Sequence, residues 1–233
     1  MIKYFDKLLL SLSEIENHPI LLVHALSGCQ LRCFHCLNRS ELIEKYHDRY
    51  YTIHDVIDYA KKQSLLFDYI VFSGGEFLLS SLDDLISDLT ILRQEVKKPV
   101  IVYTNGIAFE KVVELHQRGL VDGFHVDMKL PFHLLTSEDF DLAELTLGIP
   151  LRDMSIPQRI LQTLEYIISV DQGLNRIRSV RYPFLGPEAF AENRLWVEAM
   201  NRQYGRHVPY DVHSFIYNTN EEVAPSFQLA RHP

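Results

Sequence analysis

Several features that would set a chain apart from ordinary globular proteins are missing from this sequence of 233 residues. The longest apolar runs, such as Pro19–Leu26, are far too short to cross a bilayer. Positive charge is not in excess, since 23 Lys and Arg face 31 Asp and Glu, so nucleic-acid binding is not expected. Residues 1–18 contain acidic side chains and no small-residue cleavage site, unlike a signal peptide. We therefore expect a cytoplasmic protein with neither a membrane nor a nucleic-acid partner.

Cysteine is scarce, and all three cysteines fall within a short stretch, at Cys29, Cys33 and Cys36. An odd and crowded set does not suit a disulfide framework, which needs pairs that close loops. In a reducing compartment, such a set indicates a metal or redox site.

The chain shows no internal repeat, low-complexity stretch or long linker. Its length suits one α/β domain, so we expect a single domain over residues 1–233, with a core at about 19–215 and a tail at 216–233. Short β-branched runs predict six strands: Ile20–Leu26, Tyr69–Phe72, Val100–Tyr103, Gly123–Asp127, Ile177–Tyr182 and Pro209–Ser214. Amphipathic runs predict helices from Thr52 to about Leu66, and over Leu82–Val96, Lys111–Gln117, Pro157–Ser169 and Glu188–Tyr204.

A strand followed by a helix, repeated about six times, predicts a parallel sheet covered by helices. Right-handed crossovers would curl this sheet into a partial (β/α)6 barrel. In such folds the chemistry gathers at the carboxyl ends of the strands. The unusual residues lie at or near those ends: Cys29–Cys36, Ser73–Glu76, Thr104–Gly106, Asp127–Lys129, Arg178 and His213.

The cysteines have the spacing C-x3-C-x2-C. Three thiolates from one loop can bind three irons of a [4Fe–4S] cubane, and no fourth cysteine exists to close the fourth iron. A zinc site completed by His35 or His24 is an alternative, although zinc normally comes with a second ligand pair at fixed spacing. Reduced bystander thiols are a further alternative. The spacing favours the cluster.

This loop resembles the signature of the radical S-adenosylmethionine (SAM) superfamily, C-x3-C-aromatic-x-C, with Phe34 in the aromatic position. The resemblance implies a [4Fe–4S] cluster on Cys29, Cys33 and Cys36, with the methionine amine and carboxylate of SAM on the open iron. It also implies reductive cleavage of SAM to methionine and a 5′-deoxyadenosyl radical, with Phe34 near the adenine. The cofactors carry the difficult chemistry, and the protein supplies orientation and shielding.

A second motif, Ser73-Gly74-Gly75-Glu76, follows the second predicted strand. Glycines let the backbone approach a ligand closely. The resemblance implies that Glu76 accepts a hydrogen bond from the ammonium of the bound methionine. A plain Gly-Gly turn with a solvated Glu76 is the alternative, and most relatives carry proline where this chain has Phe77.

Two further motifs follow the third and fourth predicted strands. Thr104, Asn105 and Gly106 could form a simple turn, but they also resemble a triplet that flanks the cofactor in glycyl radical enzyme activases. Asp127 and Lys129 are two apart and should point to one face of a strand end. A surface ion pair is the alternative, whereas the resemblance implies that both residues lie near the cofactor carboxylate.

Arg178 and His213 match the family's later strands more loosely. The resemblance implies that Arg178 offers its guanidinium to the cofactor carboxylate and that His213 lies by the adenosyl group. With 11 histidines in the chain, a purely structural His213 remains an alternative. We interpret four aromatic residues as core and rim packing rather than a binding box: Tyr182, Tyr210, Phe215 and Tyr217.

Together the motifs look most like the compact activases of anaerobic ribonucleotide reductase, over roughly residues 1–215. That resemblance implies abstraction of a hydrogen from the Cα of one glycine in a large partner enzyme, leaving a glycyl radical. It also implies an electron donor such as flavodoxin or ferredoxin. Ser11, Leu12 and Asn38 fit this group, whereas residues 14–19 depart from its usual Asp-Tyr-Pro-Gly run. Residues 131–152 indicate no particular partner.

Two alternatives remain open at this point. One is a radical SAM enzyme that acts on a small molecule or a peptide, such as a 7-carboxy-7-deazaguanine synthase-like enzyme, which a closed barrel mouth with substrate ligands would favour. The other is a non-catalytic iron–sulfur or zinc protein, which would not cleave SAM.

Overall fold

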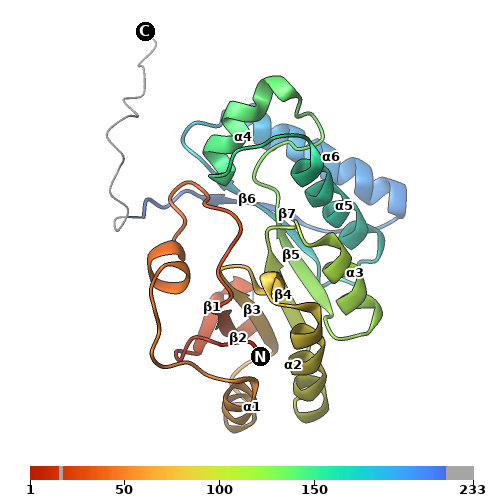
Figure 1. Ribbon diagram of the computed structural model, residues 1–233. Coiled ribbons are helices and arrows are strands. Elements are labelled where there is room, and N and C mark those ends of the chain that lie inside the picture. Colours follow the sequence, from red (N-terminus) through yellow and green to blue (C-terminus); the bar gives the residue numbers. More distant parts are fainter. Residues whose placement is uncertain (16–17, 219–233) are drawn as a thin grey trace.

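The computed structural model describes residues 1–15 and 18–218, which form a curled half-barrel sheet flanked by helices (Figure 1). The seven strands follow one another across the sheet in sequence order. The first pair is antiparallel and every other neighbouring pair is parallel. The strands are β1 (Leu9–Ile15), β2 (His18–Ala25), β3 (Tyr69–Gly74), β4 (Val100–Thr104), β5 (Gly123–Asp127), β6 (Arg176–Arg181) and β7 (Tyr210–Ser214).

Helices connect the parallel strands, as the alternating pattern predicts. They are α1 (Ile53–Lys62), α2 (Leu82–Glu95), α3 (Phe109–Gln117), α4 (Phe140–Leu147), α5 (Ser155–Ser169) and α6 (Pro187–Tyr204), with short turns η1 (Arg39–Ile43), η2 (Phe77–Leu79) and η3 (Ser137–Asp139). The predicted partial (β/α)6 barrel is therefore confirmed, with β2–β7 as its six parallel strands.

The two faces of the sheet carry different cores, because side chains alternate along each strand. On the face covered by helices, Phe72, Val102 and Leu21 belong to a large continuous cluster of buried apolar residues. On the inner face a much smaller apolar cluster fills the base of the half-barrel: Ile20, Leu22, Val71, Ile101 and Tyr103. Polar side chains such as His24, Asp127 and Arg178 lie further along the inner face and line the site.

Two elements were not predicted from the sequence. Strand β1 comes before the alternating strands and helices and pairs antiparallel with β2. No crossover helix therefore separates the two strands to indicate that β1 exists. Its leucines are poorly covered, with Leu12 78% exposed, so its pattern does not resemble that of a buried parallel strand. Helix α4 lies between β5 and α5 and ends at Gly148, which adopts φ +68°. Helix α1 also ends at Lys62, short of the predicted Leu66.

The described residues include no helix long and apolar enough to span a membrane. Part of the predicted tail packs against the domain, since Asn218 is only 6% exposed. The rest of that tail, residues 219–233, lies outside the described residues, as do Glu16 and Asn17 of the segment that departs from the activase pattern.

Candidate active site

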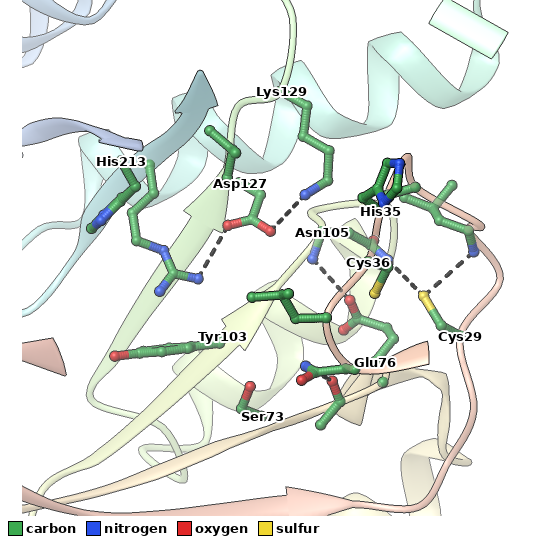
Figure 2. Close-up of a pocket in the computed structure, with 18 of the residues that line it drawn as sticks. Cys29, His35, Cys36, Ser73, Glu76, Tyr103, Asn105, Asp127, Lys129 and His213 are labelled. Carbon is green, nitrogen blue, oxygen red and sulfur yellow. Dashed lines mark hydrogen bonds and ion pairs between the residues drawn. The ribbon is translucent and has the colours of Figure 1, made fainter. Parts of the chain in front are cut away.

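The carboxyl ends of the parallel strands surround a cavity of about 530 Å³ (Figure 2). Every residue that the sequence singled out as a metal ligand or cofactor contact lines this cavity: Cys29, Cys33, Phe34, Cys36, Gly74, Gly75, Glu76, Thr104, Asn105, Asp127, Lys129, Arg178 and His213. These positions therefore lie together at the strand ends, as predicted, although the sequence did not indicate how their side chains pair with one another.

The cysteine loop follows β2 and is held from two sides by hydrogen bonds. The backbone N–H groups of Arg32 and Phe34 donate to the carbonyls of Leu147 and Thr146 at the end of α4, over 2.9 and 3.3 Å. On the other side, Asn38 Nδ2 donates to the carbonyl of Gly74 over 2.6 Å. The cysteine loop is thus held to the end of β3 and to α4, a helix that was not predicted from the sequence.

The three thiols are partly buried. Burial raises the pKa of the Cys29 thiol to about 11. It also raises the pKa of Cys33, although the nearby Lys129 ammonium counteracts this. The thiolate form at these positions therefore needs a strongly cationic partner to stabilise it. A coordinated metal is such a partner, because it deprotonates its thiol ligands outright.

A [4Fe–4S] cluster fits this donor set. Each of three thiolates binds a different iron of a cubane, so the sulfurs need not converge on one point. A single zinc ion would need convergent ligands, and within residues 1–15 and 18–218 no group of three or more His, Cys, Asp and Glu side chains is placed to hold one ion. Cys29, Cys33 and Cys36, which line the cavity, would hold the cluster.

The glycine pair of the second motif allows β3 to pass close to its neighbours. A Cβ on Gly74, which has φ +120°, would lie 2.4 Å from the carbonyl oxygen of Ala25. A Cβ on Gly75 would lie 2.1 Å from the carbonyl oxygen of Gly28. The backbone N–H of Glu76 instead donates to that Gly28 oxygen over 2.7 Å. Glycine is therefore required because the motif packs directly against the start of the cysteine loop.

Glu76 is buried, contrary to the alternative of a solvated side chain. Its carboxylate accepts hydrogen bonds from the Thr104 hydroxyl at 2.9 Å, the Asn105 N–H at 2.8 Å and the Leu78 N–H at 3.2 Å. Burial raises the pKa of Glu76 to about 7, although these hydrogen bonds favour the charged form. A carboxylate has about four acceptor positions, so one remains for an ammonium group from the cavity.

The Thr104-Asn105-Gly106 triplet forms a turn that also serves the site. Gly106 has φ +83°, as a turn glycine should. Besides the bond to Glu76, Asn105 directs its Nδ2 at Cys29 Sγ over 3.9 Å, and its Oδ1 accepts from Gln30 Nε2 over 3.3 Å. The turn and cofactor interpretations therefore do not exclude each other, since this turn connects Glu76 with the cysteine loop.

Asp127 and Lys129 form a partly buried ion pair at the cavity rather than a surface one (Figure 2). Lys129 Nζ lies 2.8 Å from Asp127 Oδ2, and Lys129 is only 8% exposed. Arg178 Nη2 donates to the other carboxylate oxygen over 3.1 Å. Burial alone would raise the pKa of Asp127, but the two cations outweigh it and lower that pKa to about 2. The group carries one net positive charge, which suits an anionic ligand.

Arg178 also makes a contact with an aromatic ring that was not predicted from the sequence. Its guanidinium lies 4.0 Å from the centre of the Tyr103 ring, in a cation–π contact. The same ring stacks on His125, with centroids 4.8 Å apart. Tyr103 lies two positions before Asn105, and His125 lies two positions before Asp127. Since side chains two apart on a strand share a face, this alternation could have identified both residues from the sequence.

Phe34 and His213 lie at the rim of the cavity. Phe34 stacks on Phe215, with centroids 5.7 Å apart, and packs edge-to-face against Phe184. Rim packing was the predicted role of Phe215, Tyr182 and Tyr217, and these residues do belong to one aromatic group that includes Phe34. His213 lines the cavity, and its side chain is exposed.

Comparison with known proteins adds to this geometry. Residues 24–133 match the family model described as the radical SAM superfamily. No curated protein sequence matches the chain. Among solved structures, coproporphyrinogen III oxidase (HemN) from Escherichia coli, described as a radical SAM enzyme, is 14% identical with a TM-score of 0.51. That alignment covers 88% of this chain and 46% of HemN.

Two other solved structures extend the comparison. The protein anSMEcpe with bound AdoMet is 16% identical, with a TM-score of 0.52, over 85% of this chain and 52% of its own. QueE from Escherichia coli is 12% identical, with a TM-score of 0.46, over 93% and 95%. This chain spans about half the length of HemN and anSMEcpe. At these identities the likeness to HemN and anSMEcpe establishes the fold and nothing about substrate.

The fold places the site at the mouth of an α/β half-barrel, where enzymes of this architecture hold their reacting groups. The match over residues 24–133 shows that this part of the chain is a radical SAM superfamily domain. Its cofactors are a [4Fe–4S] cluster and SAM. The alternative of a non-catalytic iron–sulfur or zinc protein is therefore set aside.

Proposed function

We propose that this radical SAM enzyme generates a glycyl radical on a partner enzyme such as anaerobic ribonucleotide reductase. The cofactors supply the one-electron cleavage that yields a hydrogen-abstracting group. The protein's part is to hold SAM beside the cluster and to admit a glycine loop of the partner to the cavity mouth. An electron donor such as flavodoxin or ferredoxin completes the reaction.

Exposed apolar side chains at the mouth carry this proposal. Leu37 and Ile216 line the cavity and are 54% and 62% exposed, and the neighbouring Tyr217 is 59% exposed. A site for a small ligand would enclose such groups, whereas a protein surface that docks on the mouth would cover them. The resemblance of the strand-end motifs to the activases supports the same partner class.

The residues around the cavity would bind SAM by complementary charge. Glu76 would accept from the methionine ammonium through its remaining acceptor position. The net positive group of Asp127, Lys129 and Arg178 would attract the methionine carboxylate. The Phe34 ring would pack near the adenine, as the resemblance implies.

A second candidate is a radical SAM enzyme that acts on a small molecule or a peptide. It is favoured by His24, which lines the inner cavity and has a buried Nδ1 without a hydrogen-bond partner in the structure. Ser73 lies beside His24 on the neighbouring strand and also lines the cavity. A buried polar atom without a partner is costly, and a polar substrate reaching the cavity floor would satisfy it.

The experiment that separates these candidates uses the reconstituted enzyme, reductant, SAM and anaerobic ribonucleotide reductase. The proposal predicts an organic radical signal by electron paramagnetic resonance that appears on the reductase. Replacing the reductase glycine that carries the radical with alanine should abolish the signal. If cluster-loaded enzyme cleaves SAM but never produces this signal, the proposed partner is wrong and the small-molecule candidate takes its place.

A further inference from the structure

The two ends of the parallel sheet meet at the cavity mouth through a segment that nothing above connects with cluster binding. β2 and β7 lie toward opposite edges of the half-barrel, with only β1 outside β2. The chain that follows β7 nevertheless runs across to the loop that follows β2, as Figure 1 shows in blue and orange. We call residues 215–218 the C-terminal strap.

Two polar contacts attach the strap to His35 and Cys36, the last two residues of the Cys29–Cys36 motif. Asn218 Nδ2 donates to the carbonyl oxygen of Cys36 over 2.8 Å. The backbone carbonyl of Asn218 lies 3.3 Å from His35 Nδ1, which donates to it in the tautomer that carries its proton there. Both groups belong to residues within or next to the cysteine motif. Asn218 is buried, so water competes little for these bonds.

Aromatic contacts reinforce this attachment. Phe215 stacks on Phe34, and its ring centroid also lies 5.9 Å from that of His35. Tyr217 packs edge-to-face against His35, with centroids 5.3 Å apart. Offset and edge-to-face pairs of this kind contribute beyond the area that they bury. Strap residues therefore contact both residues that lie between Cys33 and Cys36.

The backbone of the loop needs such support at this point. His35 has φ +48°, the one positive φ among the described residues other than glycine. A non-glycine residue persists in this conformation when its surroundings hold it there. The anchors at Arg32, Phe34 and Asn38 lie on either side of His35, whereas the strap contacts His35 and Cys36 themselves.

We propose that the C-terminal strap positions the cysteine loop for cluster binding, with Asn218 as its principal positioning residue. The strap holds Cys36 in the geometry of an iron ligand and covers the flank of the cavity beside it. Phe215 and Ile216 line the cavity, so the same segment shields the site from water. This role is independent of which substrate the enzyme uses.

The test compares Asn218→Asp with Asn201→Asp in the full-length, reconstituted protein. Aspartate at 218 cannot donate to the Cys36 carbonyl. Asn201 is a matched control, because its Nδ2 also donates to a backbone carbonyl, that of Val208 over 2.9 Å, between α6 and β7. The readouts are the anaerobic rate of iron removal by a chelator and the electron paramagnetic resonance spectrum of the reduced cluster, neither of which needs a partner enzyme.

We expect Asn218→Asp to release iron about fivefold faster than the wild type, the effect of one lost hydrogen bond, and to alter the spectrum of the reduced cluster. Asn201→Asp should release iron at the wild-type rate. If Asn218→Asp does not fold, Phe215→Leu, which removes the stack on Phe34, is measured in the same way. Wild-type iron release in the variant measured, or equal acceleration in Asn201→Asp, would overturn the proposal.

Discussion

The backbone N–H of Glu76 donates a hydrogen bond to the carbonyl oxygen of Gly28 over 2.7 Å. Gly28 immediately precedes Cys29, so this bond joins the two motifs that the sequence places one strand apart. Glu76, which is expected to bind SAM, is therefore directly connected to the loop that is expected to bind the cluster. Gly75 lies where the two backbones come closest.

Substitution of Gly75 by alanine should disrupt this connection. Its Cβ would meet the Gly28 carbonyl at 2.1 Å, so the backbone of the cysteine loop must shift. We expect a loss of about 2 kcal/mol or more in the free energy of unfolding, as for other overpacked sites, together with reduced iron content after reconstitution. Denaturant unfolding and iron analysis measure the two effects.

Gly119→Ala is the matched control for this substitution. Gly119 has φ +65°, but a Cβ there would meet nothing within 4 Å. The expected cost is about 1 kcal/mol of backbone strain, with normal iron content. Equal iron loss in both variants would show that general destabilisation, and not the contact with Gly28, is responsible.

The affinity for SAM should depend on pH through Glu76. Because burial raises the pKa of this carboxyl to about 7, the unliganded site is largely protonated below that pH. An amino group that donates its N–H to this carboxylate favours the ionised form, so binding releases the proton. Affinity should therefore fall below about pH 7, approaching tenfold for each pH unit. Equilibrium dialysis with cluster-loaded protein measures this profile.

Glu76→Gln supplies the comparison for the pH profile. The amide does not titrate, so the variant should bind SAM weakly at every pH, and its pH dependence between 5 and 7 should be flatter than that of the wild type. An unchanged profile in Glu76→Gln would assign the titration to another group.

Asp127 should contribute stability that acid removes. Its pKa is lowered to about 2 from an ordinary value of 3.8, since Lys129 and Arg178 outweigh the opposing effect of burial. The fold therefore favours the ionised form, and this contribution is complete above about pH 4 and is lost as the pH falls toward 2. A difference of this size corresponds to about 2 kcal/mol.

Urea unfolding of the apo-protein across this pH range tests the contribution. The stability difference between wild type and Asp127→Asn should shrink by about 2 kcal/mol between about pH 5 and pH 2. A difference that does not vary with pH would mean that the two cations do not hold Asp127 ionised in the folded protein.

Local patterns were sufficient to predict the parallel strands and the location of the site. Strands β3 and β4 carry apolar, β-branched runs, and β6 and β7 alternate between apolar and polar residues. Chain direction alone then brings the ends of the parallel strands together. Pairings between distant residues were not predictable in the same way. Arg178 on β6 binds Asp127 on β5 and covers Tyr103 on β4, which depends on strand curvature and side-chain length rather than on any motif.

Elements without a burial pattern were missed for a different reason. Strand β1 lies at the sheet edge, and although Leu10–Ser13 alternates between apolar and polar residues, its leucines are exposed and face no core. The contact of Asn218 with Cys36 spans 182 residues and involves one side chain in an irregular segment. Sequence periodicity carries no information about such a contact.

The central claim is that Cys29, Cys33 and Cys36 hold a [4Fe–4S] cluster that cleaves SAM, and one variant tests it directly. Wild-type protein reconstituted without oxygen should bind about four irons per chain and, with dithionite and SAM, form 5′-deoxyadenosine. Cys33→Ala, treated identically, should lose both the cluster and the product. If Cys33→Ala still formed 5′-deoxyadenosine at the wild-type rate, the assignment of the cluster to these cysteines would be wrong.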